Sequence, residues 1–538
     1  MSQAAFARIF SDGAVLQRGK KINVWGFAEA GTALSVRLGD KVCNCRADAD
    51  GRFDASFPPM EKGGPYVLCV TDGDKQAAES RDIMIGDVLL ISGQSNMEYP
   101  MENVRESYPS EWDEPNDPLL RSFKVIENGV FTDTLPDVLT GEWKSLSKDS
   151  IDGMSAVGYF TAKQLRSKED VAVGLVDISL GGAPLEAFMS RQMLEGYDEA
   201  LNEARPFEDD DYREGVLSDN ERYENEWLRD LDEGDRGLKE HFEDGRAILE
   251  KGSPIVLPDY FSDTELDAFC GSVWFARTFE VPEEYAARKA KLWFGIITDL
   301  DSCYVNGQFI GNTEFTYPSR RYEIPEGLLH AGTNTVVFRI GVEKGYGKVA
   351  PGRLLAVIFG DGVRTTDGYN EGFEGADHII SLGGLWKYII GNKTKASRDQ
   401  IFVNWKPTAL FYGMLGPLAG FSIKAFVFYQ GESNCRKYNE YADLTRRFVM
   451  GLRKLWDDDF YYVCIQLPEF GPRMEEITYD KGVAWRGLMK AQEEVVKIPG
   501  AFLVKAYGTG ELNDLHPQRK APLGRMIAEI LYKLQIGP

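Results

Sequence analysis

The sequence predicts an α/β protein built on a doubly wound parallel sheet, with a β-domain before the sheet and a β-sandwich inserted within it. Four continuous apolar runs rich in β-forming residues occur at residues 87–92, 171–179, 425–430 and 461–467. Such runs are typical of strands buried on both faces of a parallel sheet. Helix-like stretches at 157–168 and 438–456 lie between them. Because alternating strands and helices form a parallel sheet covered by helices, this pattern indicates the α/β class.

Two other regions have the texture of antiparallel β-structure. Residues 1 to about 85 alternate apolar and polar positions between Gly, Asp and Pro turns. Residues 268–392 show the same alternation, and "VNGQFIG" within them contains the Asn-Gly pair typical of a β-hairpin turn. Residues 206 to about 252 are dense in charge, which is typical of a solvated helical segment. The predicted organisation is an N-terminal β-domain (1–85), a first part of the α/β domain (86–225), a charged helical linker (226–267), the inserted β-domain (268–392) and a second part of the α/β domain (393–538).

The charge of the chain argues against a nucleic-acid partner. Its 538 residues include 84 Asp and Glu against 61 Lys and Arg, a formal net charge of −23. Nucleic-acid binding neutralises phosphates with surplus Lys and Arg, so a small molecule is the better-suited partner for this surface. Seven cysteines without a CxxC pair predict reduced thiols and no zinc site.

The chain shows no sign of membrane attachment. Its first residues lack the apolar core of a signal peptide, and no run of 18 apolar residues occurs. We therefore expect a cytoplasmic protein, or an exported one if a signal peptide was removed. No feature of the sequence indicates the oligomeric state.

The strand predicted at 87–92 runs directly into the turn Gly93-Gln94-Ser95-Asn96-Met97. A serine between a strand and a helix is where α/β hydrolases carry their nucleophile. It is equally an ordinary helix N-cap. The turn alone leaves both interpretations open.

A serine nucleophile needs a base, and the chain has only four histidines: His241, His330, His378 and His516. The first lies on a charged helical face, the second in a turn, and the third suits a structural position. His516 follows the apolar strand predicted at 501–507, and catalytic loops of open α/β sheets lie at the carboxyl ends of strands. Ser95 and His516 are thus a candidate pair if the first and last strands meet, with Asp514 as a candidate acid. The alternative is a helix cap and a surface histidine.

Two further polar turns follow predicted strands. Gly181-Gly182 lie in "SLGGAPLEAF", and Gln430, Glu432 and Asn434 lie in "FYQGESNC". Backbone N–H groups and side-chain amides in such turns can stabilise an oxyanion, at about 3–4 kcal/mol per donor. Each turn is also compatible with glycine at positive φ and with helix capping. The chain has no GxSxG, GxxxxGK[ST] or HExxH motif, which argues against ordinary lipases, P-loop proteins and zinc proteases.

Four segments together resemble the sialate O-acetylesterase family of the SGNH/GDSL hydrolases, which has acetylxylan-esterase relatives. They are "ISGQSNMEYPM", "VGLVDISLGGAPLEAFMSRQML", "PTALFYGMLGPLAGFSIKAFVFYQGESN" and "NDLHPQRKAPLGRMIAEIL". The resemblance covers most of the chain. It implies an SGNH-type, flavodoxin-like sheet, and the insertion is similar to the galactose-binding-like jelly roll of many glycosidases.

The resemblance also implies roles for individual residues. Ser95 matches the nucleophile and His516 the base, while the Ser95 N–H, Gly182 and Gln430, preferred here over Asn434, would form the oxyanion hole. The reaction would be hydrolysis of an O-acetyl ester on a sugar through an acetyl-enzyme, with no metal or other cofactor. The residues expected to contact the substrate are Gln94, Asn96, Glu432 and Asn434.

The acid of the site departs from the family pattern. Many SGNH enzymes carry Asp three residues before the histidine, but Asn513 occupies that position here and Asp514 stands two residues before His516. Whether Asp514, Asn513, Glu511 or a main-chain carbonyl orients His516 stays open, as does a Ser–His dyad.

The leading hypothesis is a carbohydrate O-acetylesterase, with 9-O-acetyl sialic acid favoured over acetylxylan or another acetylated glycan. A second hypothesis is a carbohydrate-binding protein with a vestigial hydrolase domain. Trp274, Trp293 and Tyr304 in the predicted sandwich motivate it. The other interpretation of these aromatic residues is core packing.

Overall fold

The computed structural model describes residues 4–73, 75–262, 264–471 and 479–536. Its central sheet runs from edge to edge through β10 (Trp143–Leu146), β9 (Asp117–Lys124), β11 (Val173–Asp177), β8 (Lys75–Gly93), β27 (Ala425–Tyr429), β28 (Tyr461–Ile465) and β29 (Ala501–Val504). Neighbours from β9 to β29 are parallel, and β10 is antiparallel to β9. The prediction of an α/β protein is confirmed.

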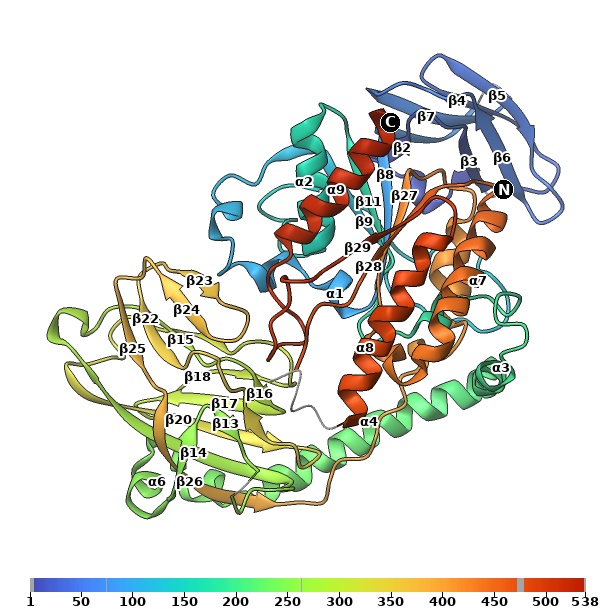
Figure 1. Ribbon diagram of the computed structural model, residues 1–538. Coiled ribbons are helices and arrows are strands. Elements are labelled where there is room, and N and C mark those ends of the chain that lie inside the picture. Colours follow the sequence, from blue (N-terminus) through green and yellow to red (C-terminus); the bar gives the residue numbers. More distant parts are fainter. Residues whose placement is uncertain (1–3, 74, 263, 472–478, 537–538) are drawn as a thin grey trace.

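Helices cover both faces of these strands. They are α2 (Ala156–Lys168), α7 (Tyr438–Trp456), α8 (Tyr479–Glu493) and α9 (Ala521–Ile536). In Figure 1 the α2–α9 pair and the α7–α8 pair lie on opposite sides of the sheet. Ser155 starts α2 by accepting a hydrogen bond from the Gly158 N–H at 3.1 Å. In α7, Leu444, Phe448 and Leu452 recur every four residues and are fully buried, so one stripe of this helix faces the core.

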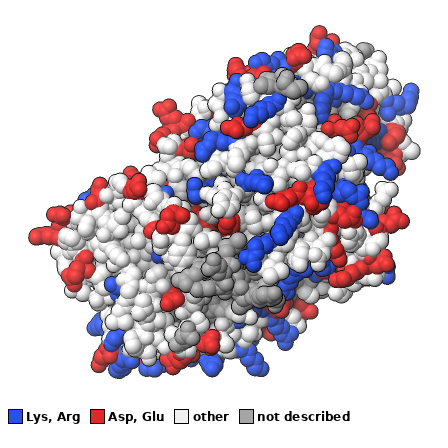
Figure 2. All heavy atoms as spheres, viewed as in Figure 1, with Lys and Arg blue, Asp and Glu red and all other residues white. Residues whose placement is uncertain are grey.

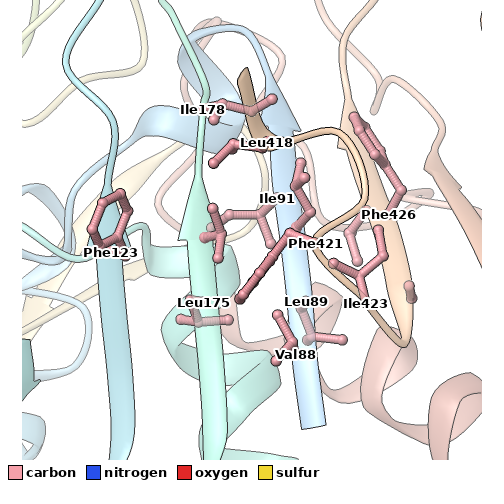
Figure 3. Packing of buried hydrophobic residues seen from close by; sticks show 14 of the residues in the cluster. Val88, Leu89, Ile91, Phe123, Leu175, Ile178, Leu418, Phe421, Ile423 and Phe426 are labelled. Carbon is pink, nitrogen blue, oxygen red and sulfur yellow. The ribbon is translucent and has the colours of Figure 1, made fainter. Parts of the chain in front are cut away.

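The core between sheet and helices is continuous and apolar. Figure 3 shows Val88, Leu89 and Ile91 of β8 close to Leu175 of β11 and Phe426 of β27. All five side chains are at most 2% exposed. Because β8 is buried on both faces, its sequence is apolar at consecutive positions, as the strand prediction assumed.

Part of the N-terminal β-region joins the same sheet through β8, and the rest forms a separate three-stranded sheet. The remaining N-terminal strands are β1 (Ala5–Phe6), β2 (Val15–Gln17), β3 (Ile22–Phe27), β4 (Ala33–Leu38), β5 (Lys41–Arg46), β6 (Arg52–Phe57) and β7 (Gly63–Asp72). The first half of β8 pairs antiparallel with β7, and its second half pairs parallel with β11 and β27. The strand predicted at 87–92 is therefore the end of a longer strand that begins at Lys75, in a sheet of mixed direction.

Between residue 252 and the return to the central sheet, two antiparallel sheets share one hydrophobic core. The larger contains β12 (Ser253–Leu257), β26 (Gly384–Lys393), β14 (Gly271–Val281), β20 (Gly332–Val342), β17 (Leu300–Val305) and β18 (Gln308–Thr313). The smaller contains β19 (Arg321–Ile324), β15 (Ala290–Trp293), β22 (Ala356–Phe359) and β25 (His378–Ser381). Short sheets add β13 (Asp259–Tyr260), β21 (Lys348–Val349) and β16 (Ile297–Thr298), and β23 (Val363–Thr366) with β24 (Glu371–Glu374). Phe275 of one sheet and Leu292 of the other belong to the same buried cluster.

The predicted Asn-Gly hairpin is confirmed. Asn306 and Gly307 connect β17 to β18 with positive φ at both residues, 50° and 81°. Two consecutive residues at positive φ match the type I′ turn that joins twisted antiparallel strands.

The charged stretch is helical and largely solvated. It contains α4 (Asp210–Glu233), α5 (Arg236–Glu240) and α6 (Arg246–Lys251), preceded by α3 (Asp198–Ala204). In α4 only Trp227 and Leu231 are buried. Figure 2 shows acidic and basic side chains interspersed over the viewed face. Among the helices of the described residues, none is both long and apolar enough to cross a membrane.

Candidate active site

The turn after β8 presents Ser95 at the carboxyl end of the central sheet. The helix α1 (Ser95–Glu98) begins one residue beyond Gln94, and Ser95 is half-buried. Gly93 has φ +133°, and a Cβ there would lie 2.0 Å from the carbonyl oxygen of Tyr429 at the end of β27. Only glycine allows this approach, which also lets the Gln94 N–H donate to the Tyr429 carbonyl at 3.0 Å.

The structure brings Ser95 and His516 together. The Ser95 Oγ lies 2.7 Å from Nε2 of His516. The first and last strands do not meet, because β27 and β28 lie between β8 and β29. The loop after β29 returns instead, and Asn96 fastens it by donating its amide to the Leu515 carbonyl at 2.9 Å and accepting from Lys520 Nζ at 2.5 Å.

The His516 imidazole lies between two tyrosine rings. Tyr99 stacks on it with centroids 5.7 Å apart, and Tyr317, from the loop between β18 and β19, meets it edge-on at 5.0 Å. Burial, together with the positive charge of Lys520, lowers the pKa of His516 to about 3. A neutral imidazole at Nε2 is the form that can take a proton from a serine.

Asp514 contacts the main chain of His516 rather than its ring. The Asp514 Oδ1 accepts from the His516 main-chain N–H at 2.8 Å, and Oδ2 pairs with Arg353 at 2.9 Å. Asn513 donates its amide to the Pro351 carbonyl at 2.5 Å. None of the hydrogen bonds in the described residues reaches Nδ1 of His516. This geometry differs from the expected orienting acid and corresponds to a Ser–His pair whose ring is held by packing.

Behind Asp514 lies a buried cluster of opposite charges. Glu511 pairs with both Arg353 and Arg364 at 2.6 Å, so it holds these arginines and not the histidine. The two guanidinium groups lower the pKa of Glu511 to about 2, although burial alone would raise it. Burial raises the pKa of Asp514 against the attraction of Arg353. Arg353 and Arg364 come from the β-rich insertion, which thereby contacts the histidine loop directly.

The Gly181-Gly182 turn after β11 lies against Ser95. A Cβ on Gly181 would stand 3.7 Å from the Ser95 Cβ. The Gly181 N–H donates to the Glu98 carboxylate at 2.7 Å and is not free. Within the described part of the chain, the N–H groups of Ser95 and Gly182 donate to no acceptor. These two donors are therefore available to an oxyanion.

Gln430 differs from its expected role as an oxyanion donor. It is fully buried, and its Nε2 donates to Asn434 Oδ1 at 2.6 Å and lies 3.2 Å from Gln94 Oε1 and 3.3 Å from the Ala183 carbonyl. Its Oε1 accepts from the Tyr441 hydroxyl. Because both amide hydrogens have acceptors inside the protein, Gln430 ties neighbouring turns together.

The four residues expected to contact substrate also bind mainly to the protein. Asn96 donates to Glu432 Oε1 at 2.6 Å, and Asn434 donates to Glu186 Oε2 at 2.7 Å. The Oε1 of Gln94 accepts from main-chain N–H groups of the turn after β27. These bonds join the turns after β8 and β27, which leaves the expected substrate contacts without support from the geometry.

The aromatic residues of the second hypothesis belong to the protein interior. Trp274 and Trp293 are 0% exposed, and their indole N–H groups donate to Asp235 at 2.9 Å and Glu371 at 2.8 Å. Tyr304 stacks on Trp274 with centroids 5.9 Å apart. The two buried, hydrogen-bonded tryptophans are not available to a glycan, and the half-buried Tyr304 packs against one of them, which favours the core-packing interpretation.

Metal-ligating side chains are scattered. No group of three or more His, Cys, Asp or Glu in residues 4–73, 75–262, 264–471 and 479–536 is arranged to hold a metal ion. All seven cysteines are free thiols.

Five residues around the site were missed by sequence reasoning: Tyr99, Tyr317, Arg353, Arg364 and Lys520. Tyr99 and Lys520 lie inside segments that carry the family resemblance, four residues after Ser95 and after His516. Their place inside these segments was the sequence signal that could have identified them as site residues. Nothing in the sequence of the insertion distinguishes the other three from surface residues.

Comparison with known proteins relates the chain to esterases of acetylated sugars. No family model matches. The chain is 26% identical over 187 residues to the sialate O-acetylesterase of Rattus norvegicus, covering 32% of this chain and 34% of that protein. It is 25% identical over 190 residues to the sialate O-acetylesterase of Homo sapiens, covering 32% of this chain and 36% of that protein. The chain is a distant relative of the sialate O-acetylesterases. The matched region spans about a third of the length of these relatives.

A solved structure extends the likeness to the whole fold. The crystal structure of a carbohydrate acetylesterase from Xanthomonas citri matches 98% of this chain and 74% of that chain, with a TM-score of 0.54 and 19% identity. At this identity the match establishes the fold.

The low pKa of His516 predicts the acid limb of the activity profile. Because a general base must be neutral, kcat/KM for p-nitrophenyl acetate is expected to persist as pH falls below about 6.5, the usual histidine value. The folded state is expected to lose stability over the same range, since the unfolded chain binds a proton there and the buried imidazole does not. An acid limb at or above pH 6.5 would contradict this account.

Tyr317 provides the matched variants for this prediction. The residue is 49% exposed and its ring packs on His516, so Tyr317→Ala is expected to hydrate the imidazole and move the acid limb toward higher pH. Tyr317→Phe keeps the ring and should leave the limb in place. An unchanged limb in Tyr317→Ala would mean that this ring does not control the pKa of His516.

Proposed function

We propose that the protein is a carbohydrate O-acetylesterase that uses Ser95 as its nucleophile. The 2.7 Å contact between Ser95 Oγ and His516 Nε2 is the observation that carries this proposal. The pair lies beside two free backbone donors, at the carboxyl ends of parallel strands, where open α/β sheets bind their ligands. Distant homology to the sialate O-acetylesterases supports the same chemistry.

In the proposed mechanism, His516 Nε2 takes the proton of Ser95 as Oγ attacks the acetyl carbonyl carbon. The N–H groups of Ser95 and Gly182 stabilise the developing oxyanion. His516 then gives the proton to the sugar oxygen as the ester bond breaks, leaving an acetyl-enzyme. A water molecule, deprotonated by His516, releases acetate and restores Ser95. Gln430, with its neighbours Gln94 and Asn434, holds the turns that carry these groups.

We propose O-acetylated sugars as substrates, with 9-O-acetyl sialic acid the first candidate because the relatives are named for sialate esters. Acetylxylan is the alternative. A panel measuring acetate release from 9-O-acetyl sialic acid, acetylxylan and acetylated chitin oligomers tests the proposal. Release from one of them at least tenfold faster than from the others is expected. No release from any, with p-nitrophenyl acetate also inert, would overturn the esterase proposal.

We further propose an SGNH-type, flavodoxin-like arrangement for the parallel strands and a jelly roll for the insertion. The run of parallel neighbours from β9 to β29, with Ser95 at the end of β8, supports the first. The shared core of two antiparallel sheets supports the second. On this view the units are residues 1–85, 86–225 with 393–538, and 268–392, joined by 226–267, whose strands β12 and β13 pair with strands of the insertion.

Gly182→Ala is expected to lower kcat for p-nitrophenyl acetate by about 10²–10³-fold, the usual cost of losing one oxyanion donor. Gly182 has φ +74°, and a Cβ there would come within 1.9 Å of the Trp405 ring, so the turn must move. Gly196→Ala is the matched control, since Gly196 has φ +88° and open space around its Cβ position. Equal activity in the two variants would remove Gly182 from the mechanism.

A further inference from the structure

A cavity of about 360 Å³ lies beside the Gly181-Gly182 turn. Its volume falls within the range of roughly 300–1,000 Å³ usual for small-ligand sites. It is bounded by the segment 127–129, by side chains of α4 and by the segment 401–405. None of these residues belongs to the catalytic groups described above.

The Gly181-Gly182 turn separates the cavity from Ser95. Trp405 forms part of its wall, donates its indole N–H to the Gly181 carbonyl at 2.8 Å, and packs against Gly182. Gly181 in turn lies against Ser95. A ligand in the cavity therefore sits next to the turn whose other side touches Ser95, which suits the neighbouring unit of a bound chain.

The walls have the chemistry of a sugar site. Phe402 stacks on Trp405 with centroids 3.9 Å apart and rings 23° from parallel, yet Phe402 is 44% exposed. Asn220 of α4 fixes this segment by bonding both the N–H and the carbonyl of Ile401, at 3.1 and 2.8 Å. The exposed Phe402 ring, stacked on the half-buried Trp405 and held on a fixed segment, offers a flat apolar face to the C–H groups of a pyranose.

The polar groups of the cavity favour an uncharged, hydroxyl-rich ligand. The side-chain amides of Asn128 and Asn404 form no hydrogen bond within the described residues, so both can bind sugar hydroxyls. The cation on the wall, Arg213, is already paired with Asp210 and donates to the Phe207 carbonyl at 2.5 Å. The cavity thus offers no spare positive charge to a carboxylate.

We propose that this cavity binds a neutral sugar residue adjacent to the one that carries the acetyl group. The inference rests on the proposed function and narrows it: the substrate is a glycan of at least two residues, of which the neighbour is uncharged.

The test compares short and long esters on the full-length protein. The probes are acetylated xylose against acetylated xylotriose, and 9-O-acetyl sialic acid against 9-O-acetyl sialyllactose. For each series that is hydrolysed, Phe402→Ala is expected to raise KM for the longer ester roughly tenfold, by removing an aromatic contact, with kcat within about twofold. KM for the shorter ester and kcat/KM for p-nitrophenyl acetate should not change.

A second cavity variant and a control outside the cavity complete the test. Asn128→Ala removes an unpaired amide and should raise KM for the longer ester in the same way, while Phe309→Ala, a 52% exposed phenylalanine outside the cavity, should not. An unchanged KM for the longer ester, or an equal rise for both esters, would overturn the inference while leaving the esterase proposal intact.

Calorimetry gives a readout that does not depend on turnover. Xylotriose or lactose should bind to Ser95→Ala, and this binding should weaken when Phe402→Ala is added. Failure of wild-type protein to hydrolyse any of these esters or p-nitrophenyl acetate would instead overturn the proposed function.

Discussion

Ser95→Ala is expected to fold normally and to lose at least about 10⁴-fold in kcat for p-nitrophenyl acetate. The Ser95 hydroxyl is the atom 2.7 Å from His516 Nε2, so its removal deletes the proposed nucleophile. The hydroxyl contributes little to packing because Ser95 is half-buried at the start of a short helix. Initial rates, with circular dichroism to verify folding, measure both expectations.

The control for this variant is Ser110→Ala. Ser110 is exposed and lies in another turn of the same part of the chain, so its removal should leave kcat unchanged. If Ser95→Ala kept more than a tenth of the wild-type activity while folding normally, the nucleophile would have to be another residue.

Arg353→Met is expected to lower the free energy of unfolding by about 3–5 kcal/mol, the usual cost of removing one partner from a buried ion pair. The Arg353 side chain is 0% exposed and pairs with Glu511 at 2.6 Å and Asp514 at 2.9 Å. Without it, Arg364 alone is left to balance Glu511, and Asp514 loses the guanidinium group it pairs with. Because Asp514 holds the His516 main chain, kcat should fall as well. Urea denaturation and kinetics of the same preparation measure the two effects.

Arg288→Met is the matched control on the same β-rich insertion. Arg288 pairs with Asp377, but the two side chains are 44% and 50% exposed, and exposed pairs contribute about 0–1 kcal/mol. Both variants remove one positive charge. A difference between their free energies of unfolding therefore reports the effect of burying the ion pair. Equal stability of the two proteins would show that the cluster behind Asp514 does not hold the histidine loop.

The sequence was most informative where local pattern decides structure. Buried parallel strands such as β11 and β27 are continuous apolar runs, and α7 has its apolar stripe at helical spacing, so both could be located from periodicity. The start of β8 was missed because its first half pairs in an antiparallel, alternating register and reads as a different element. A change of sheet direction within one strand has no sequence signal.

The candidate site was predictable in part, for a related reason. Ser95 and His516 stand out because each follows an apolar strand, and histidine is scarce in this chain. The partner of Glu511 was not predictable, since Arg353 lies 158 positions away in the insertion. The family resemblance implied an oxyanion role for Gln430, whereas its amide is consumed by hydrogen bonds with Gln94, Ala183 and Asn434. Such satisfaction of buried polar groups depends on tertiary contacts.

The most direct test of the Ser95–His516 assignment is covalent labelling of the wild-type protein with diethyl p-nitrophenyl phosphate, followed by peptide mass spectrometry. An activated serine displaces p-nitrophenolate and keeps the diethyl phosphoryl group. The account predicts one adduct, on the peptide that contains Ser95, and its loss in His516→Ala. An adduct on a different residue, or undiminished labelling of Ser95 without His516, would contradict the account.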